Sequence, residues 1–152
     1  MKIVVQNKKA RHDFAILETI EAGIALRGTE VKSLREGRAN LRDSYALVEK
    51  GEVVLRGLQI MPYSHTSDRA IDPLRDRKLL LNREEIRKLT AKINEKGMTL
   101  VALKVYFNPR GIAKVELGLA KGKRLYDKRE TIAERESKRD VDRAMKRARQ
   151  GD

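Results

Sequence analysis

The stretch VALKVYFNPRGIAKVELGL, residues 101–119, decides the fold class of this chain. Apolar residues alternate in both of its halves, which is typical of β-strands with one buried face. The alternating positions are Val101, Leu103, Val105 and Phe107, then Ala113, Val115, Leu117 and Leu119. Residues 108–111, Asn-Pro-Arg-Gly, have the composition of a tight turn, because Pro presets φ and Gly tolerates a positive φ. The stretch therefore predicts an antiparallel hairpin.

Upstream of this hairpin, shorter apolar stretches separated by glycine are typical of a β-meander. An extended pattern begins at Phe14, and we expect it to break at residues 21–23 before it resumes. Residues 45–48 and 53–55 predict a second hairpin around Gly51, which can occupy a left-handed turn position.

The strand pattern continues through Leu58 and Ile60 to Pro62. Residues 63–77 have no periodicity and predict a long loop, of a length that is often functional. Residues 8–12 form a basic entry segment, for which a solvated arm and an RNA contact both remain open.

Two helices are predicted. A short one begins at Gly28-Thr29 and ends at Gly37. The longer one begins after Asn82, which can cap it together with Glu85 three residues on, and ends at Gly97. Its apolar face is formed by Ile86, Leu89, Thr90 and Ile93.

Six or seven short antiparallel strands in so short a chain protect their edges best by closing into a barrel. We therefore expect a mainly β protein, a closed antiparallel barrel with two or three short helices. Its relation to the oligonucleotide-binding fold is an analogy. The expected domain spans residues 1–120, and residues 121–152 form a basic C-terminal tail.

The net charge of +13 over 152 residues predicts a polyanionic partner, because neutralising phosphates releases counterions. In the tail, basic residues are interleaved with acidic ones around a thin apolar stripe, Val141, Ala144, Met145 and Ala148. Burying that stripe recovers less free energy than ordering the tail costs. We expect the tail to be disordered in the free protein and helical when bound, with a surface helix packed on the barrel as the alternative.

Other classes of function have little support in the sequence. No apolar run has the length of a membrane span, so no membrane partner is expected. Cys is absent, which favours a cytoplasmic location and excludes thiolate metal sites and Cys nucleophiles. His12 and His65 have no ligand partner at a metal-binding spacing, and only Asp68, Asp72 and Asp76 form a candidate carboxylate cluster. We expect no enzyme, no cofactor, no metal and no small-molecule substrate.

Structured RNA is the partner that the composition favours. The few aromatic residues argue against extensive base stacking, so recognition of phosphates and shape is expected. Tyr126, inside the basic tail, is the one aromatic residue well placed to stack on a base.

Several longer motifs, taken in order, resemble the bacterial SsrA-binding protein family, also called small protein B. They are Asn7-Lys8-Lys9-Ala10-Arg11-His12, Glu21-Ala22-Gly23, Gly28-Thr29-Glu30-Val31-Lys32-Ser33-Leu34-Arg35, Asp43-Ser44-Tyr45, Asp72-Pro73, Arg77-Lys78-Leu79-Leu80-Leu81-Asn82, Gly118-Leu119-Ala120-Lys121-Gly122-Lys123 and Tyr126-Asp127-Lys128-Arg129. The resemblance runs from Asn7 to about Met145, without a large insertion.

This resemblance implies a non-enzymatic partner of transfer-messenger RNA (SsrA) in trans-translation. Such a protein grips the tRNA-like domain with its barrel, as a monomer with one RNA, and delivers the RNA to stalled ribosomes for rescue and peptide tagging. Its tail is implied to lie in the empty mRNA channel and to contact ribosomal RNA of the decoding centre. The rival interpretations are a ribosomal protein, another translation factor that binds structured RNA, or an enzyme acting on RNA.

The residues implied for the barrel's RNA contact are Glu21, Leu80 and Asn82, with Asn7, Lys8, Arg11, His12 and Arg35 around them. Those implied for the tail's contact with the ribosome are Lys121, Lys123, Arg124, Tyr126, Asp127, Lys128 and Arg129. Two of these residues have structural alternatives, and the charge of a third limits what it can contact. Asn82 is also the expected helix cap, and Leu80 could belong to the core. Glu21 repels phosphate, so it must accept from a base or ribose donor. Residues 146–152 match the family too loosely to interpret.

Overall fold

A computed structural model gives the fold and describes residues 1–63 and 71–122. Within these ranges it contains nine strands and three helices. In chain order they are β1 (Lys2–Gln6), α1 (Lys8–Asp13), β2 (Phe14–Ile24), α2 (Gly28–Arg35), β3 (Ala39–Asn40), β4 (Tyr45–Glu49), β5 (Glu52–Arg56), β6 (Gln59–Ile60), β7 (Arg77–Leu80), α3 (Arg83–Lys96), β8 (Thr99–Phe107) and β9 (Ala113–Gly122).

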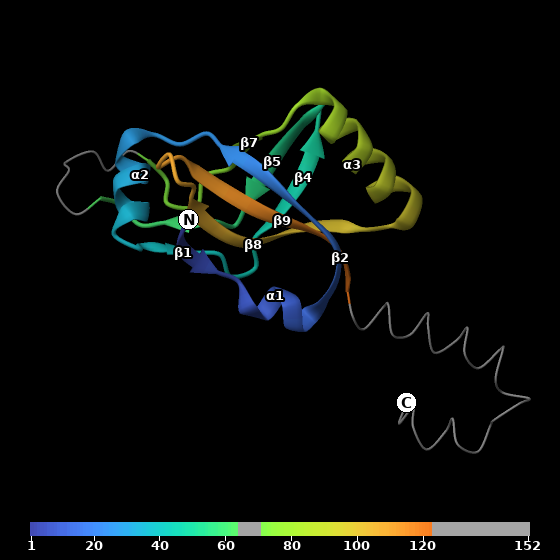
Figure 1. Ribbon diagram of the computed structural model, residues 1–152, viewed down its shortest axis with the longest axis horizontal. Coiled ribbons are helices and arrows are strands. Elements are labelled where there is room, and N and C mark those ends of the chain that lie inside the picture. The colour runs from blue at the N-terminus through green and yellow to red at the C-terminus, as the bar shows by residue number, and fades with distance from the viewer. Residues whose placement is uncertain (64–70, 123–152) are drawn as a thin grey trace, which may run out of the picture.

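Seven of the strands form one antiparallel sheet, in the order β1-β8-β4-β5-β7-β2-β9. A further pairing joins β9 to β8, so six strands make a continuous ring of hydrogen-bonded neighbours. β1 pairs with the second half of β8, while β4 pairs with its first half. β3 and β6 form a separate two-stranded sheet. Figure 1 shows α2 at one end of the strands, α3 at the other and α1 beside β1 and β2.

The two predicted hairpins are confirmed. β8 and β9 are joined through Asn108, whose side-chain oxygen accepts from the backbone N–H of Arg110 and of Ile112, and Gly111 has φ 77°. β4 and β5 are joined through Lys50 and Gly51, at φ 50° and 75°. Positive φ at both central residues is the turn geometry that matches the twist of a two-stranded ribbon.

The predicted single buried face of β8 is wrong. Ala102 pairs with Leu117 and Lys104 pairs with Glu116, so Leu103 is an extra residue that the partner strand does not match. Such a bulge shifts the alternation by one position. Before it, Leu100 and Ala102 point into the main core and Val101 and Leu103 point outward; after it, Val105 and Phe107 point into the core. The outward pair is buried under Ala10 of α1.

Other expectations for the first half of the chain need correction. β2 runs unbroken through residues 21–23, because Gly23 is paired on both sides, with Leu80 and with Lys114. The pattern after Val53 does not continue as one strand to Pro62, because it ends before Gly57, at φ 87°, and Gln59 and Ile60 pair with β3 instead. The basic entry segment at residues 8–12 is not an extended arm but lies in helix α1.

Residues 63–77 are only partly a loop. Arg77 begins strand β7, which pairs with β5 and β2 and which the sequence pattern did not reveal. Residues 64–70 lie outside the described residues. β7 pairs with a strand on each side, and this fixes the position of Leu80 at its end and of Asn82, the cap of α3, two residues later.

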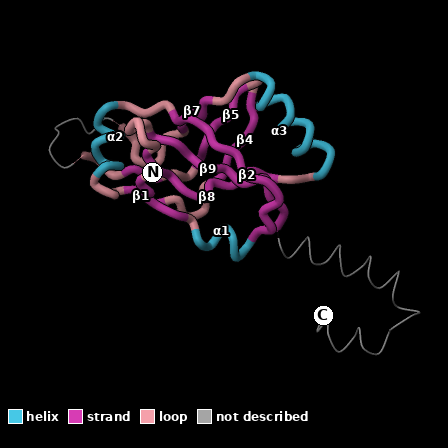
Figure 2. The backbone as a smooth tube through the Cα atoms, in the orientation of Figure 1, coloured by secondary structure: helices cyan, strands magenta, loops and turns pink. Residues whose placement is uncertain are grey.

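Both predicted helices are confirmed, and Figure 2 shows all three helices on the perimeter of the strands. The amide oxygen of Asn82 accepts from the backbone N–H of Glu85 at 2.8 Å, and the carboxylate of Glu85 accepts from the backbone N–H of Asn82 at 3.2 Å. Gly97 ends α3 at φ 61° and ψ 38°. Leu89 packs on the core, flanked by Ile86 and Ile93.

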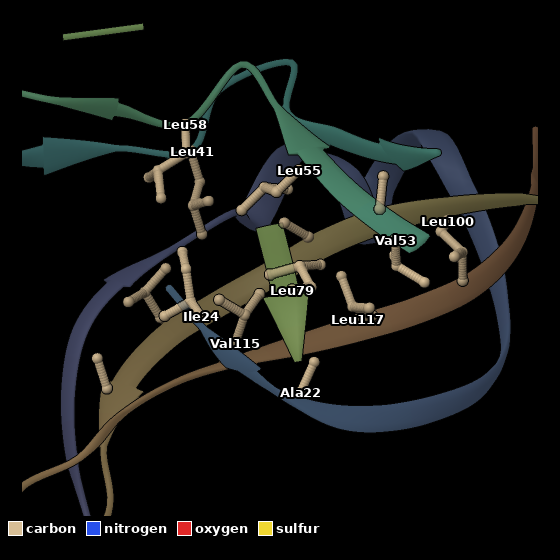
Figure 3. Packing of buried hydrophobic residues seen from close by; sticks show 14 of the residues in the cluster. Ala22, Ile24, Leu41, Val53, Leu55, Leu58, Leu79, Leu100, Val115 and Leu117 are labelled. Carbon is tan, nitrogen blue, oxygen red and sulfur yellow. The ribbon is translucent and has the colours of Figure 1, made fainter. Parts of the chain in front are cut away.

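The main core fills the inside of the ring. Figure 3 shows side chains from β2, β5, β7, β8 and β9 converging on it, among them Ala22, Leu55, Leu79, Leu100 and Leu117. All five are at most 1% exposed. Burial of apolar area at this density is the main favourable contribution to folding.

A buried charged cluster holds the start of β7. Arg77 is fully buried, and its guanidinium donates to Glu30 at 2.9 Å from Nε and to the carbonyl oxygens of Leu58, Pro73 and Arg75. Glu30, on α2 and 3% exposed, also accepts from Arg75 at 2.5 Å and from the backbone N–H of Arg27 at 2.9 Å. Because both charges are paired and hydrogen-bonded, the cluster is stable in the interior.

Candidate RNA interface

The outward-facing side chains of β7, β2, β9 and β8 share one surface, which we call the grip face. Its members are Leu80, Glu21, Gly23, Lys114, Glu116, Lys104 and Tyr106. The strand register places them in two rows. One row holds Glu21, Glu116 and Lys104; the other holds Leu80, Gly23, Lys114 and Tyr106.

Glu21 is exposed, and its Oε2 accepts a hydrogen bond from the hydroxyl of Tyr106. Tyr106 is on β8 and Glu21 on β2, so this contact crosses β9, which lies between them. Only 5% of Tyr106 is exposed. Burial raises the pKa of the Tyr106 phenol, and the hydrogen bond and negative charge of Glu21 raise it further, so the hydroxyl stays protonated as a donor.

Glu116, directly opposite Glu21 on the neighbouring strand, is surrounded by cations. Its Oε1 lies 3.4 Å from Arg11 Nη2 and its Oε2 lies 3.8 Å from Lys104 Nζ. Lys104 Nζ also lies over the ring of Tyr106, at 5.6 Å from its centroid. Both cations are thus directed at Glu116 and not at Glu21.

Leu80 pairs with Gly23, two residues along β2 from Glu21. Leu80 is 51% exposed, so its alternative assignment to the core is wrong; Leu79 is the buried neighbour. A Cβ at Gly23 would lie 3.2 Å from Leu80 Cβ, so glycine leaves room for this leucine on the surface. The pairing of β7 with β2 ends at Leu80 and Gly23, and Asn82 follows two residues later at the N-terminus of α3.

Asn82 caps α3, which confirms the structural role expected for it. Of its side chain, the cap uses only the amide oxygen. Among the residues that the structure describes, none accepts from its amide nitrogen. Cap and RNA contact are therefore compatible, because they use different atoms of one side chain.

Asn7, Lys8 and Arg11 adjoin the grip face through α1. They line a shallow pocket of about 130 Å³ together with Lys104 and Glu116. Asn7 itself is committed to the fold, since it accepts from the backbone N–H of Ala10 and donates to the carbonyl oxygens of Leu41 and Ala102. Lys8 and Arg11 are both exposed, and the guanidinium of Arg11 pairs with Glu116.

His12 and Arg35 lie apart from this group. The His12 side chain is 87% exposed and its Nδ1 lies 3.0 Å from Asp13. Arg35, near the end of α2, stacks on the ring of Phe107 at 4.9 Å from the centroid, beside the turn that joins β8 and β9.

Of the residues assigned to the tail, Lys121 lies in β9, where it pairs with Ala15. The other six, from Lys123 to Arg129, lie outside the described residues. β9 ends at Gly122, next to Phe14 at the start of β2.

Sequence reasoning missed Lys104, Tyr106 and Glu116. The signal was present in the hairpin stretch, since these residues alternate with the apolar ones that we used to predict the core. On a strand, the positions between core residues point to the opposite face.

The described residues contain no group of three His, Asp or Glu side chains that could hold a metal ion. In the former candidate carboxylate cluster, Asp72 accepts from the backbone N–H of Leu74 and Asp76 pairs with Arg56 at 3.2 Å, while Asp68 lies outside the described residues. No helix of the described part is long and apolar enough to cross a membrane.

Comparison with known proteins gives the family. The model of the family described as SmpB protein matches residues 4–147. The chain belongs to the SmpB family. Among its relatives, an SsrA-binding protein of Moorella thermoacetica is 58% identical over 146 residues, 96% of this chain and 94% of that protein. One from Syntrophobacter fumaroxidans is 60% identical over 149 residues, 98% of this chain and 92% of that protein.

A solved SmpB structure has the same architecture. It comes from the work described as "tmRNA-SmpB: a journey to the center of the bacterial ribosome". The match has a TM-score of 0.66 at 57% sequence identity and covers 78% of this chain and 83% of that one. A mainly β protein with a large antiparallel sheet and three helices is therefore the SmpB architecture in this chain as well.

Proposed function

We propose that this SmpB-family protein binds the tRNA-like domain of transfer-messenger RNA and delivers it to stalled ribosomes for trans-translation. One observation carries the proposal: the family match extends over nearly the whole chain, and the similar solved structure is one of tmRNA and SmpB on the ribosome. We place the protein in the cytoplasm, as one copy with one RNA, acting by binding and without catalysis.

The grip face is the proposed RNA site on the folded part. Exposed Leu80, which covers Gly23, offers an apolar surface for a base or ribose. The amide nitrogen of Asn82 can donate, and the outer oxygen of Glu21 can accept. Lys8 and Arg11, at the margin, supply phosphate contacts, which give affinity without sequence information.

We further propose that the ring of six strands is a closed barrel related to the oligonucleotide-binding fold, ending near residue 120, and that the tail beyond it enters the mRNA channel and the decoding centre. This division of labour is supported by where the last strand ends. Every described element lies at or before Gly122, so a chain cut there keeps the whole described fold.

The test is a reconstituted tagging reaction on stalled ribosomes, with protein saturated with transfer-messenger RNA. The chain cut after Gly122 should bind the RNA but fail to support tagging. Replacing Asp127, Lys128 and Arg129 by alanine should fail in the same way with less loss of RNA affinity. Normal tagging by the cut chain would refute the role of the tail.

A ribosomal protein remains the rival within the RNA-binding class, and sedimentation separates the two. A delivery factor should leave ribosomes when the salt is raised, because its contacts with ribosomal RNA depend on phosphate neutralisation. Retention on ribosomal subunits at high salt would favour the rival. Turnover of RNA that depends on a divalent metal would instead indicate an enzyme.

A further inference from the structure

We propose that Tyr106 is the positioning residue of the grip face, orienting Glu21 so that its outer oxygen accepts a hydrogen bond from a donor group of the RNA. This inference rests on the proposed function and adds to it the chemistry that Glu21 reads. A donor group of RNA is a base amino or imino group or a ribose 2′-hydroxyl, never a phosphate.

The first step is that Glu21 would otherwise be free to rotate. It is exposed, and a glutamate has three rotatable side-chain bonds whose ordering costs free energy. The hydroxyl of Tyr106 fixes Oε2 from two strands away, and among the described residues no hydrogen bond or ion pair involves Oε1. One oxygen is therefore held by the protein while the other is presented outward.

The second step is that Tyr106 is itself immobile. Its ring is 5% exposed, lies under the ammonium group of Lys104 and must cross β9 to reach Glu21. A buried tyrosine hydroxyl needs a partner, and Glu21 is the one the structure provides. Each residue therefore depends on the other: Glu21 satisfies the buried hydroxyl of Tyr106, and the fixed Tyr106 hydroxyl orients the carboxylate of Glu21.

Glu21 carries a negative charge that no described cation pairs with, because Arg11 and Lys104 are directed at the neighbouring Glu116. An unpaired carboxylate oxygen repels a phosphate and favours a neutral hydrogen-bond donor. Glu21 therefore contributes to specificity and not to electrostatic affinity.

The experiment measures binding of a transcript of the tRNA-like domain at several salt concentrations. The variants are Tyr106→Phe, Glu21→Gln and the double variant, with Tyr45→Phe as a control on β4, outside the grip face. We expect each single variant to weaken binding about tenfold or more, the scale of a hydrogen bond to a charged group. The dependence on salt should not change, and Tyr45→Phe should bind as the wild type.

The decisive readout is the coupling between the two residues. If Tyr106 acts through Glu21, the double variant binds about as weakly as either single variant. If Tyr106 only stabilised the fold, the two substitutions would act independently, and the fold-loss of RNA affinity in the double variant would be the product of the two single losses. This result would overturn the inference. So would a Tyr106→Phe protein that binds as tightly as the wild type.

The source of the donor is found with transcripts carrying scattered 2′-deoxy or inosine substitutions, which remove a ribose hydroxyl or a guanine amino group. Further transcripts remove single adenine or cytosine amino groups or methylate single imino nitrogens, so that every kind of donor is tested. A position that weakens binding to the wild type but not to Tyr106→Phe names the donor; if no position of any kind behaves so, the inference is wrong. The proposed function fails separately, if the wild type binds this transcript no better than another structured RNA of equal length.

Discussion

Replacing Arg77 by methionine removes a fully buried guanidinium while keeping a side chain of similar length. The change leaves Glu30 with fewer partners and takes the donor from the carbonyl oxygens of Leu58 and Pro73. Breaking a buried ion pair by removing one partner costs about 3–5 kcal/mol of unfolding free energy. We expect a loss in this range, measured by urea unfolding at neutral pH.

The pH dependence gives an independent check. Burial by itself raises the pKa of Glu30, but hydrogen bonds from Arg75, the Arg27 amide and Arg77 outweigh it, and the pKa lies below its usual value. A carboxyl whose pKa is lowered by folding contributes stability above its unfolded-state pKa and loses it as pH falls through its folded-state pKa. The wild type should therefore lose this contribution in acid, below the ordinary glutamate range.

In Arg77→Met the lowering contributions from Arg77 are gone and burial remains, so the pKa of Glu30 rises. Protonation then relieves the buried charge, and the difference in stability between variant and wild type should narrow as the pH falls toward 4. The matched control is the double variant with Glu30→Gln, which carries no charge to bury. It should recover at least about 1 kcal/mol relative to additive behaviour. A loss below about 1 kcal/mol for Arg77→Met, or a gap that is constant with pH, would refute the reasoning.

Three further pairs of variants follow from the geometry. Leu79→Ala should cost about 2–5 kcal/mol of unfolding free energy, whereas Leu80→Ala, at an exposed position, should cost about 0.5 kcal/mol or less yet weaken RNA binding; equal effects on stability would contradict the assigned faces. Asn82→Ala should lose about 1 kcal/mol through its cap, while Asn82→Asp keeps the cap and replaces two donors by a negative charge, so weaker RNA binding with normal urea unfolding is expected; unchanged binding would leave Asn82 as a cap only. Ser33→Ala should be neutral or stabilising, because the buried hydroxyl has no hydrogen-bond partner among the described residues, whereas Ser44→Ala removes a 2.6 Å bond to Leu41 and should cost about 1 kcal/mol in the same assay.

Local chemistry was sufficient for the hairpin of β8 and β9 and for helix α3. The turn at residues 108–111 and the cap at Asn82 each depend on groups within four residues of one another. The family was also readable from the sequence, because its motifs are long and follow in order, and the comparisons confirm it. Of the candidate site, the residues named by motif include Glu21 and Leu80, which the pairing of β2 with β7 places on one surface, and Asn82, which caps the helix that follows β7.

What required the tertiary structure is the set of features that depend on a distant partner. The bulge at Leu103 exists only against β9, so the alternation of β8 alone gave the wrong face. Arg77 follows a segment without periodicity, so the sequence pattern placed it in a loop. It can be buried because its guanidinium pairs with Glu30, forty-seven residues earlier in the chain. Tyr106 contacts Glu21 across an intervening strand, eighty-five residues away in sequence.

The physical reason is the range of the interactions. Turn preferences, caps and periodicity express the energies of neighbouring residues, so a sequence pattern reports them directly. Register, bulges and the pairing of buried charges are decided by which strands close the ring, and that choice minimises the free energy of the whole domain. The sequence by itself thus determined the strands of the main hairpin, the long helix and the family. The tertiary structure alone decided which side chains face the core and which share the grip face.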